Sequence, residues 1–133
     1  MILLDLVVYT VRLVLPFFLY DDHVPQHDST LSGHLYYEEI INTHNRNRFL
    51  SINRMDKRTF ILLVDLLVTS GKLKDSLCIC AGQKLMIFIH SLLGNSNRET
   101  AERWQHSGST ISDIIHEVVE SLYHCIGILF ISE

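Results

Sequence analysis

The chain has few residues that break helices and no set of cysteines that could form a disulfide framework. Its 133 residues include two prolines and six glycines, which excludes collagen-like and long low-complexity segments. Its three cysteines, Cys78, Cys80 and Cys125, are an odd number, so a reducing compartment is the simpler interpretation. Apolar residues make up 47% of the chain and charged residues 20%, which fits one small globular domain.

Positive charge is scarce where a nucleic-acid-binding protein would need it. The net charge is −4 at pH 7, and basic residues outnumber acidic ones only between residues 29 and 81, by seven to five. From Gly82 onward there are three basic and six acidic residues. Because contacts from Lys and Arg to phosphates supply most non-specific affinity for nucleic acids, this distribution argues against strong binding.

The first twenty residues, Met1–Tyr20, are mostly Leu, Val, Ile and Phe and are long enough for a membrane span. Asp5 and Arg12 interrupt them at a cost inside a bilayer, and no small-residue cleavage site follows. Their spacing of seven puts both charges on one helix face, as in a buried or interfacial helix. We therefore predict an apolar helix over residues 1–20, with a membrane segment as the alternative, and a linker over 21–33.

Helical spacing of apolar residues continues through the middle of the chain. We predict helices over Leu35–Thr43, from the capping residue Asp56 to about Thr69 with Gly71 after it, and over Gln83–Leu93. The Asn- and Arg-rich segment Asn42–Asn53 is predicted to be irregular. The positions expected to carry apolar side chains toward the core are Leu35, Tyr36, Ile40, Ile41, Phe60, Leu63, Val64, Leu67, Leu85, Phe88, Ile89 and Leu92. The pattern predicts an all-α domain.

The segment Gly94–Tyr123 predicts a helix-turn-helix. Ser96 and Glu99 have the spacing of a capping box before a short helix that ends at Trp104, and Gln105-His106 forms the break. Ser107 is a strong N-cap for the next helix, whose apolar stripe is Ile111, Ile114, Ile115, Val118 and Leu122. Such a module lays its second helix in a DNA major groove, and the alternative is simply two packed helices.

This segment contains the pattern RxxAxRxQHSGSTIS, followed by an amphipathic helix. Three sequence blocks upstream belong to the same family pattern: Leu31–Gly33 with Glu38–Ile41 and His44, Arg54–Phe60, and Ser76–Leu93. Together, from about Thr30 to Tyr123, they resemble the N-terminal helix-turn-helix domain (DUF8040-like) of Harbinger-type (PIF/Harbinger) transposases and their domesticated relatives. The resemblance implies a helical domain over residues 34–125 with its helix-turn-helix at 96–123, a tail over 126–133, double-stranded DNA as the partner and a nuclear location. A membrane location through Met1–Tyr20 is the alternative.

Two groups of residues are candidates for contact with DNA. In the second helix, Ser107–His116 is expected to face the groove, with Ser107 and Thr110 as candidates and Ser109, Ser112, Asp113 and His116 as the exposed positions of the first turns. Gly108–Tyr123 contains no Lys or Arg, and relatives usually carry a basic residue where Asp113 stands. Aspartate can accept a hydrogen bond from cytosine, but it repels phosphates. The second group is Arg54, Lys57 and Arg58, from a cluster that includes Arg46 and Arg48, with Lys72 and Lys74 beyond; its alternative is a solvated face.

Catalysis is not expected. The transposases that this chain resembles cut DNA with three acidic residues that hold metal ions in a downstream nuclease domain, and this chain ends at Glu133, where that domain would begin. Cys78 and Cys80 are closer than a usual zinc pair, with no second pair after them. We therefore predict no catalytic, metal or cofactor residues. The sequence favours a truncated or domesticated DNA-binding module, and the alternative is a protein-interaction or vestigial helical domain, membrane-tethered in one version.

Overall fold

The computed structural model describes residues 8–9, 27–69 and 72–131. Its helices in these ranges are α2 (Gly33–Ile41), α3 (Arg46–Asn53), α4 (Lys57–Thr69), α5 (Ala81–Leu92), α6 (Asn97–Trp104) and α7 (Gly108–Ile131). The described residues contain no strand. The all-α class predicted from the sequence is confirmed.

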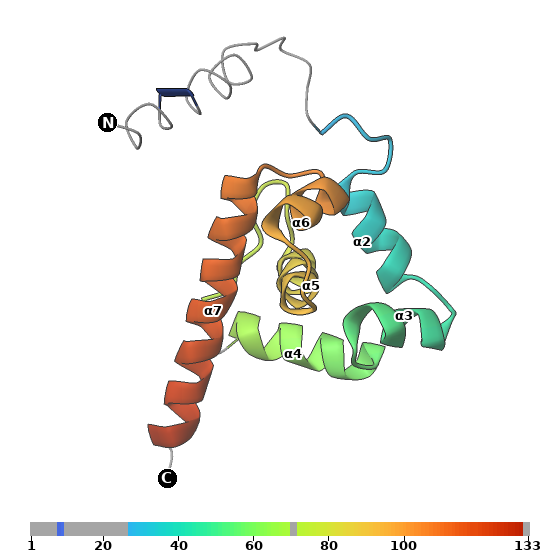
Figure 1. Cartoon of the computed structure of the whole chain (residues 1–133). Helices are drawn as coiled ribbons and strands as arrows, with labels where there is room; N and C mark the ends of the chain where they lie inside the picture. Colours follow the sequence, from blue (N-terminus) through green and yellow to red (C-terminus); the bar gives the residue numbers. More distant parts are fainter. Residues whose placement is uncertain (1–7, 10–26, 70–71, 132–133) are drawn as a thin grey trace.

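Helix α5 is the central element, and Figure 1 shows the other helices arranged around it. It contacts α2, α3, α4, α6 and α7, and every residue from Ala81 to Ile87 is buried. Leu85 and Ile89 lie in the core as predicted. Leu92 was predicted to point inward but is 68% exposed, because it lies in the last turn of α5, just before the chain turns at Gly94.

Helix α2 begins two residues earlier than its apolar pattern indicates. The Ser32 side chain accepts a hydrogen bond from the Leu35 backbone N–H, which places the helix start at Gly33, inside the predicted linker. Tyr36 and Ile40 are buried as expected, whereas Leu35 is exposed. The start of the helix is therefore set by the cap. Leu35 lies on the exposed face of α2, opposite the face that packs on the core.

The segment predicted to be irregular contains helix α3, so that prediction was wrong. Asn45 caps it by accepting from the Arg48 N–H at 3.1 Å. Phe49 is buried and packs edge-to-face on Phe60 of α4, with ring centroids 5.6 Å apart. One buried aromatic residue does not produce a helical periodicity in the sequence. Packing against α4 and α5 stabilises this helix, which its intrinsic helix propensity alone would not.

Helix α4 starts after Asp56, as predicted, because the Asp56 carboxylate accepts from the Thr59 N–H at 2.9 Å. Phe60 and Leu67 are fully buried, and Leu63 and Val64 pack partly against the core. Gly71, which was expected to end this helix, lies outside the described residues. The inner face of α4 is thus the one that the sequence indicated.

Helix α7 carries the predicted stripe: Ile111, Ile114 and Val118 are buried, and Ile115 and Leu122 pack against them. The helix continues to Ile131, well beyond the predicted end at Tyr123 and through most of the predicted tail. No Pro follows to stop it, and the Cys125 thiol, buried under α4, lies 3.9 Å from the Leu66 carbonyl oxygen. Packing on α4 therefore extends the buried face of α7 to Cys125, two residues past the predicted end.

The predicted apolar helix over Met1–Tyr20 falls outside the described residues except for Val8 and Tyr9, as do residues 21–26 of the predicted linker. Its helical and membrane alternatives therefore stay predictions. Among the helices of the described ranges, none combines the length and apolar character needed to span a bilayer.

Candidate nucleic-acid interface

Helix α6 begins at the capping box that the sequence predicted. The Ser96 hydroxyl accepts from the Glu99 N–H at 3.1 Å, and the Glu99 carboxylate accepts from the Ser96 N–H at 2.7 Å. The hydrogen bonds from Ser96 lower the pKa of Glu99. The first helix of the pair is therefore fixed by two reciprocal bonds that depend on two side chains.

The turn between α6 and α7 is held from outside as well as from within. Gln105 adopts the left-handed conformation, with a φ of 55°, and ends α6. The His106 N–H donates to the Ala101 carbonyl at 3.1 Å. The Gln105 side-chain oxygen accepts from the Ser29 N–H at 3.0 Å, so the chain before α2 is attached to this turn. The break at Gln105-His106 is confirmed: local bonds end α6 there, and the bond from Ser29 adds a contact distant in sequence.

The hydroxyl groups at the start of α7 form one cluster. Ser107 caps the helix by accepting from the Thr110 N–H at 3.2 Å. Its Oγ also lies 3.0 Å from the Ser109 hydroxyl and 2.8 Å from the Thr110 hydroxyl. Three candidate DNA-binding residues thus lie together at the positive end of the helix dipole, where anions bind favourably.

The remaining candidates on α7 differ in what holds them. Ser112 is tied to α6, because the Asn97 amide donates to its hydroxyl at 3.3 Å and to the Gly108 carbonyl at the same distance. Asp113 and His116 are exposed, and His116 Nδ1 lies 2.7 Å from the Ser112 carbonyl oxygen. Asn97 was missed by the sequence analysis, since nothing local marks an amide that bridges two helices.

Glu117, one turn further along α7, is not a free negative charge. The Lys84 ammonium of α5 lies 2.9 Å from both of its carboxylate oxygens. The acidity of this part of α7 is therefore smaller than the sequence indicates. No sequence signal could have paired two residues 33 positions apart.

The basic candidates surround a different part of the molecule. Arg46, Lys57 and Arg58 line a hollow of about 530 Å³ together with His44 and Asp56; we call it the basic hollow. Hydrogen bonds from Thr59 lower the pKa of Asp56, and Arg46 and Arg58 lower it further.

Two further members of the basic cluster are placed less simply. Arg54 ends α3 in the left-handed conformation, with a φ of 56°, beside this region. Arg48 is paired with Glu39, which takes it out of the cluster that the sequence suggested. Of the five basic residues at the α3–α4 corner, those of the basic hollow, with Arg54 next to it, are therefore left to contact an anion.

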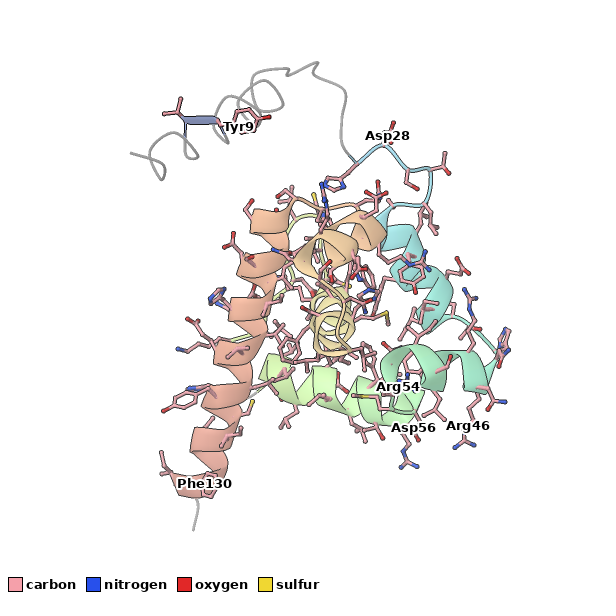
Figure 2. The ribbon with its side chains drawn as sticks, viewed as in Figure 1. Tyr9, Asp28, Arg46, Arg54, Asp56 and Phe130 are labelled. Atoms are coloured by element: carbon pink, nitrogen blue, oxygen red, sulfur yellow. The ribbon has the colours of Figure 1, made fainter. Side chains whose placement is uncertain are left out.

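The structure does not bring the two candidate groups together. The basic hollow lies at the start of α4, whereas Leu66, near the other end of α4, contacts Cys125 of α7. That contact is about 14 Å from Lys57 along α4 and about 27 Å from Ser107 along α7, at 1.5 Å per residue. Figure 2 shows Arg46, Arg54 and Asp56 together at the α3–α4 corner, away from α7.

A polar groove of about 830 Å³ runs between residues 27–31 and α6. Arg98, Glu99 and Glu102 are among its lining residues, so its charge is mixed. The Arg103 guanidinium, at its edge, lies 3.8 Å from the centre of the Tyr36 ring. The groove reaches the start of α7 at Gly108, but none of the candidate DNA-binding side chains on α7 lines it.

Cys80 and Cys125 have structural surroundings in this fold, whereas Cys78 is exposed. Cys80 caps α5, its sulfur accepting from the Gln83 N–H at 3.4 Å. Burial and, after it, Cys80 raise the pKa of the neighbouring Tyr37 to about 12. Within the ranges that the structure describes, no three His, Cys, Asp or Glu side chains are grouped so that they could hold a metal ion.

The comparisons with known proteins give one match. No curated protein and no solved structure matches the chain. The family model described as Domain of unknown function (DUF8040) matches residues 28–124, which hold α2 to α6 and most of α7. Since this match covers well over half of the chain, the protein belongs to the DUF8040 family.

Proposed function

We propose that this chain is a non-catalytic DNA-binding module, derived from the N-terminal domain of a Harbinger-type transposase. The observation that carries the proposal is the pair α6 and α7, joined by a tight left-handed turn and supported by α5. The start of α7 is capped and polar and exposes Asp113 and His116. This is the arrangement in which a second helix enters the major groove.

The electrostatics of α7 set the expected strength of binding. The positive helix N-terminus at Ser107–Thr110 attracts phosphate. Lys84 neutralises Glu117, which leaves Asp113 as the exposed carboxylate nearest to that end and Glu120 about two turns later. Asp113 repels the DNA backbone. We therefore expect weak binding that salt weakens further.

The basic hollow supplies a second set of phosphate contacts in this proposal. Arg46, Lys57 and Arg58 outnumber the one carboxylate of Asp56 there. Since the hollow and the start of α7 are far apart, each would contact its own stretch of phosphates. Each lost phosphate contact reduces the salt dependence of log K by about one.

The test is a titration of a fluorescent random-sequence duplex with the wild type, Asp113→Arg and Lys57→Gln/Arg58→Gln at two salt concentrations. Asp113→Arg should bind more tightly by roughly 1–3 kcal/mol, that is by about 5- to 150-fold, because a repulsion becomes a contact. Lys57→Gln/Arg58→Gln should bind more weakly and with a smaller salt slope.

The matched control is Glu120→Arg, which makes the same charge change at an exposed position of the same helix. If it strengthens binding as much as Asp113→Arg, the effect reports net charge and the placement of α7 in the groove is wrong. Tight wild-type binding that ignores salt would contradict the electrostatic account as well.

The proposal includes no nuclease activity. The purified chain should leave supercoiled plasmid intact in magnesium and in manganese, because the acidic triad of the related transposases has no counterpart in it. Metal-dependent cleavage that persists after replacement of Asp21 and Asp22 would show a catalytic site that the proposal lacks. A nuclear location follows from the same proposal, and a fluorescent fusion of the full chain tests it against a membrane location.

A second candidate function is that of a protein-interaction domain. The observation that favours it is the row of exposed apolar side chains on the C-terminal half of α7, namely Val119, Tyr123, Ile126, Ile128, Phe130 and Ile131. Large contiguous apolar patches on a protein surface often mark sites of interaction with another protein.

A further inference from the structure

Four of these exposed side chains form a straight ridge along α7, which we call the seam. Val119, Tyr123, Ile126 and Phe130 are 48%, 80%, 50% and 76% exposed. Their spacings are four, three and four residues, the spacing of the contact positions of a coiled coil. A ridge of this spacing is the shape that fits a second helix.

The seam is not part of the protein's own core. The buried positions of this half of α7 are Val118, Ser121 and Cys125, which face α4 and α5 and lie on another side of the helix. The middle of the seam is rotated by about 140° from the middle of that buried side, at 100° per residue. Helix α7 therefore has two apolar faces in this half, and only one of them is covered by the described residues.

The order of the seam residues makes it complementary to itself. A spacing of four, three and four reads the same in both directions, so an antiparallel copy meets the seam in register. Val119 then lies opposite Phe130 of the second copy, and Tyr123 lies opposite Ile126 of the second copy. Every layer pairs one aromatic ring with one smaller β-branched side chain, which keeps the layers equal in size. A two-fold interface requires this reciprocity.

The flank of the seam also suits an antiparallel pair. In that register Glu120 lies beside Gly127 of the second copy, so no like charges meet there. A Cβ at Gly127 would have nothing within 4 Å in the single chain, so the space beside the seam is open. Glycine inside a helix costs about 1 kcal/mol relative to alanine, and a close approach of a second helix is a reason to have one there.

We propose that the seam binds a second copy of this chain, with the two α7 helices packed antiparallel about the midpoint between Tyr123 and Ile126. This inference specifies the partner in the second candidate function and does not depend on binding to DNA. Since the seam spans eleven residue steps, its length is about 17 Å. Such an interface is small, so we expect a dimer with a dissociation constant on the order of micromolar.

The experiment is sedimentation of the full chain over concentrations from about 1 to about 100 µM, a range that brackets such a constant. The wild type should pass from monomer to dimer. Tyr123→Arg and Ile126→Glu should each be monomeric throughout, because each puts two charges into the seam. The matched control is Leu62→Arg, a charge at an exposed apolar position of α4 outside the seam, which should dimerise like the wild type.

A mixture of the two monomeric variants tests the register. If position 123 faces position 126 of the other copy, Tyr123→Arg and Ile126→Glu form a hetero-dimer with one Arg–Glu layer and one intact Tyr–Ile layer. A parallel pair would align each position with itself, and the mixture would stay monomeric. Far-UV circular dichroism of each variant confirms the fold, which exposed substitutions leave in place.

Three results would overturn the proposal. The first is a wild type that is monomeric at every concentration, which would leave residues 1–26 or another protein as the occupant of the seam. The second is a dimer that both single variants retain, which would place the interface elsewhere. The third is a mixture of the variants that fails to associate, which would exclude the antiparallel register.

Discussion

Lys84 of α5 and Glu117 of α7 form an ion pair in which the ammonium lies 2.9 Å from both carboxylate oxygens. The same ammonium donates to the Lys74 carbonyl at 2.8 Å, so all its donors have acceptors. The Lys84 side chain is 5% exposed and the Glu117 side chain 33%. The pair thus joins the central helix to α7 through one buried and one partly solvated charge.

The unequal burial of this pair predicts unequal effects of the two single substitutions. Glu117→Gln leaves a buried ammonium without its counter-charge and should lower the free energy of unfolding by about 3 kcal/mol. Lys84→Met removes the buried charge and leaves a carboxylate that water reaches, so it should cost less than half of that. Urea unfolding of both variants and of the double variant measures this. If Lys84→Met proves the more damaging, burial does not govern the pair.

Trp104 should dominate the stability of the core. It is fully buried and packs edge-to-face with Tyr36 and His90, at centroid distances of 5.0 and 6.3 Å. Trp104→Ala should cost about 3–5 kcal/mol. Tyr123→Ala, at an exposed aromatic, should change the free energy by less than about 0.5 kcal/mol in the monomer. Because Trp104 is the single Trp of the chain, its fluorescence also reports the site. A wild-type emission maximum typical of indole in water would contradict its burial.

Two glycine-to-alanine substitutions should have opposite signs. A Cβ at Gly33 would lie 2.2 Å from the Trp104 carbonyl oxygen, a backbone atom that cannot move aside. Gly33→Ala should therefore destabilise the protein by about 1–3 kcal/mol. At Gly127 a Cβ meets nothing within 4 Å, and the residue is helical. Gly127→Ala should stabilise the monomer by about 0.4–1 kcal/mol. Thermal unfolding at low protein concentration compares them, and equal signs would refute the account of Gly33.

The protein should lose stability as the pH falls from about 8 to about 5, the range in which unfolded histidines become protonated. Burial lowers the pKa of His106, and His27 lowers it further; burial followed by Arg103 lowers that of His90. The unfolded chain therefore binds more protons than the folded one in this pH range. The free energy of unfolding consequently rises with pH.

Melting temperatures of the wild type and His106→Gln at several pH values test this. The variant should show a smaller loss between neutral and mildly acidic pH, since it has one fewer histidine held neutral. The pKa values of Asp56 and Glu99 are also lowered, but carboxyl groups become protonated at lower pH, so they contribute little to the stability change in this range. A melting temperature that is flat or rises as the pH falls would contradict the prediction.

Features that depend on neighbours along the chain were predictable from the residues alone. The Ser96–Glu99 box, the Ser107 cap and the Asp56 cap are bonds over three residues, and each is formed as predicted. The all-α class and the buried stripe of α7 follow from apolar spacing alone. The DUF8040 family was also recognisable from the ordered sequence blocks, whereas the link to Harbinger-type transposases and the DNA contacts stay predictions.

Tertiary structure decided everything that joins residues distant in the chain. Helix α3 forms because Phe49 packs against Phe60. Glu117 is neutralised because α5 places Lys84 beside it. Leu92 is exposed because α5 ends there. The fold also separates the basic hollow from the start of α7, although both were candidates for one interface. Local hydrogen bonds are encoded within a few residues, but burial and charge pairing depend on which helices meet, and only the packed structure fixes that.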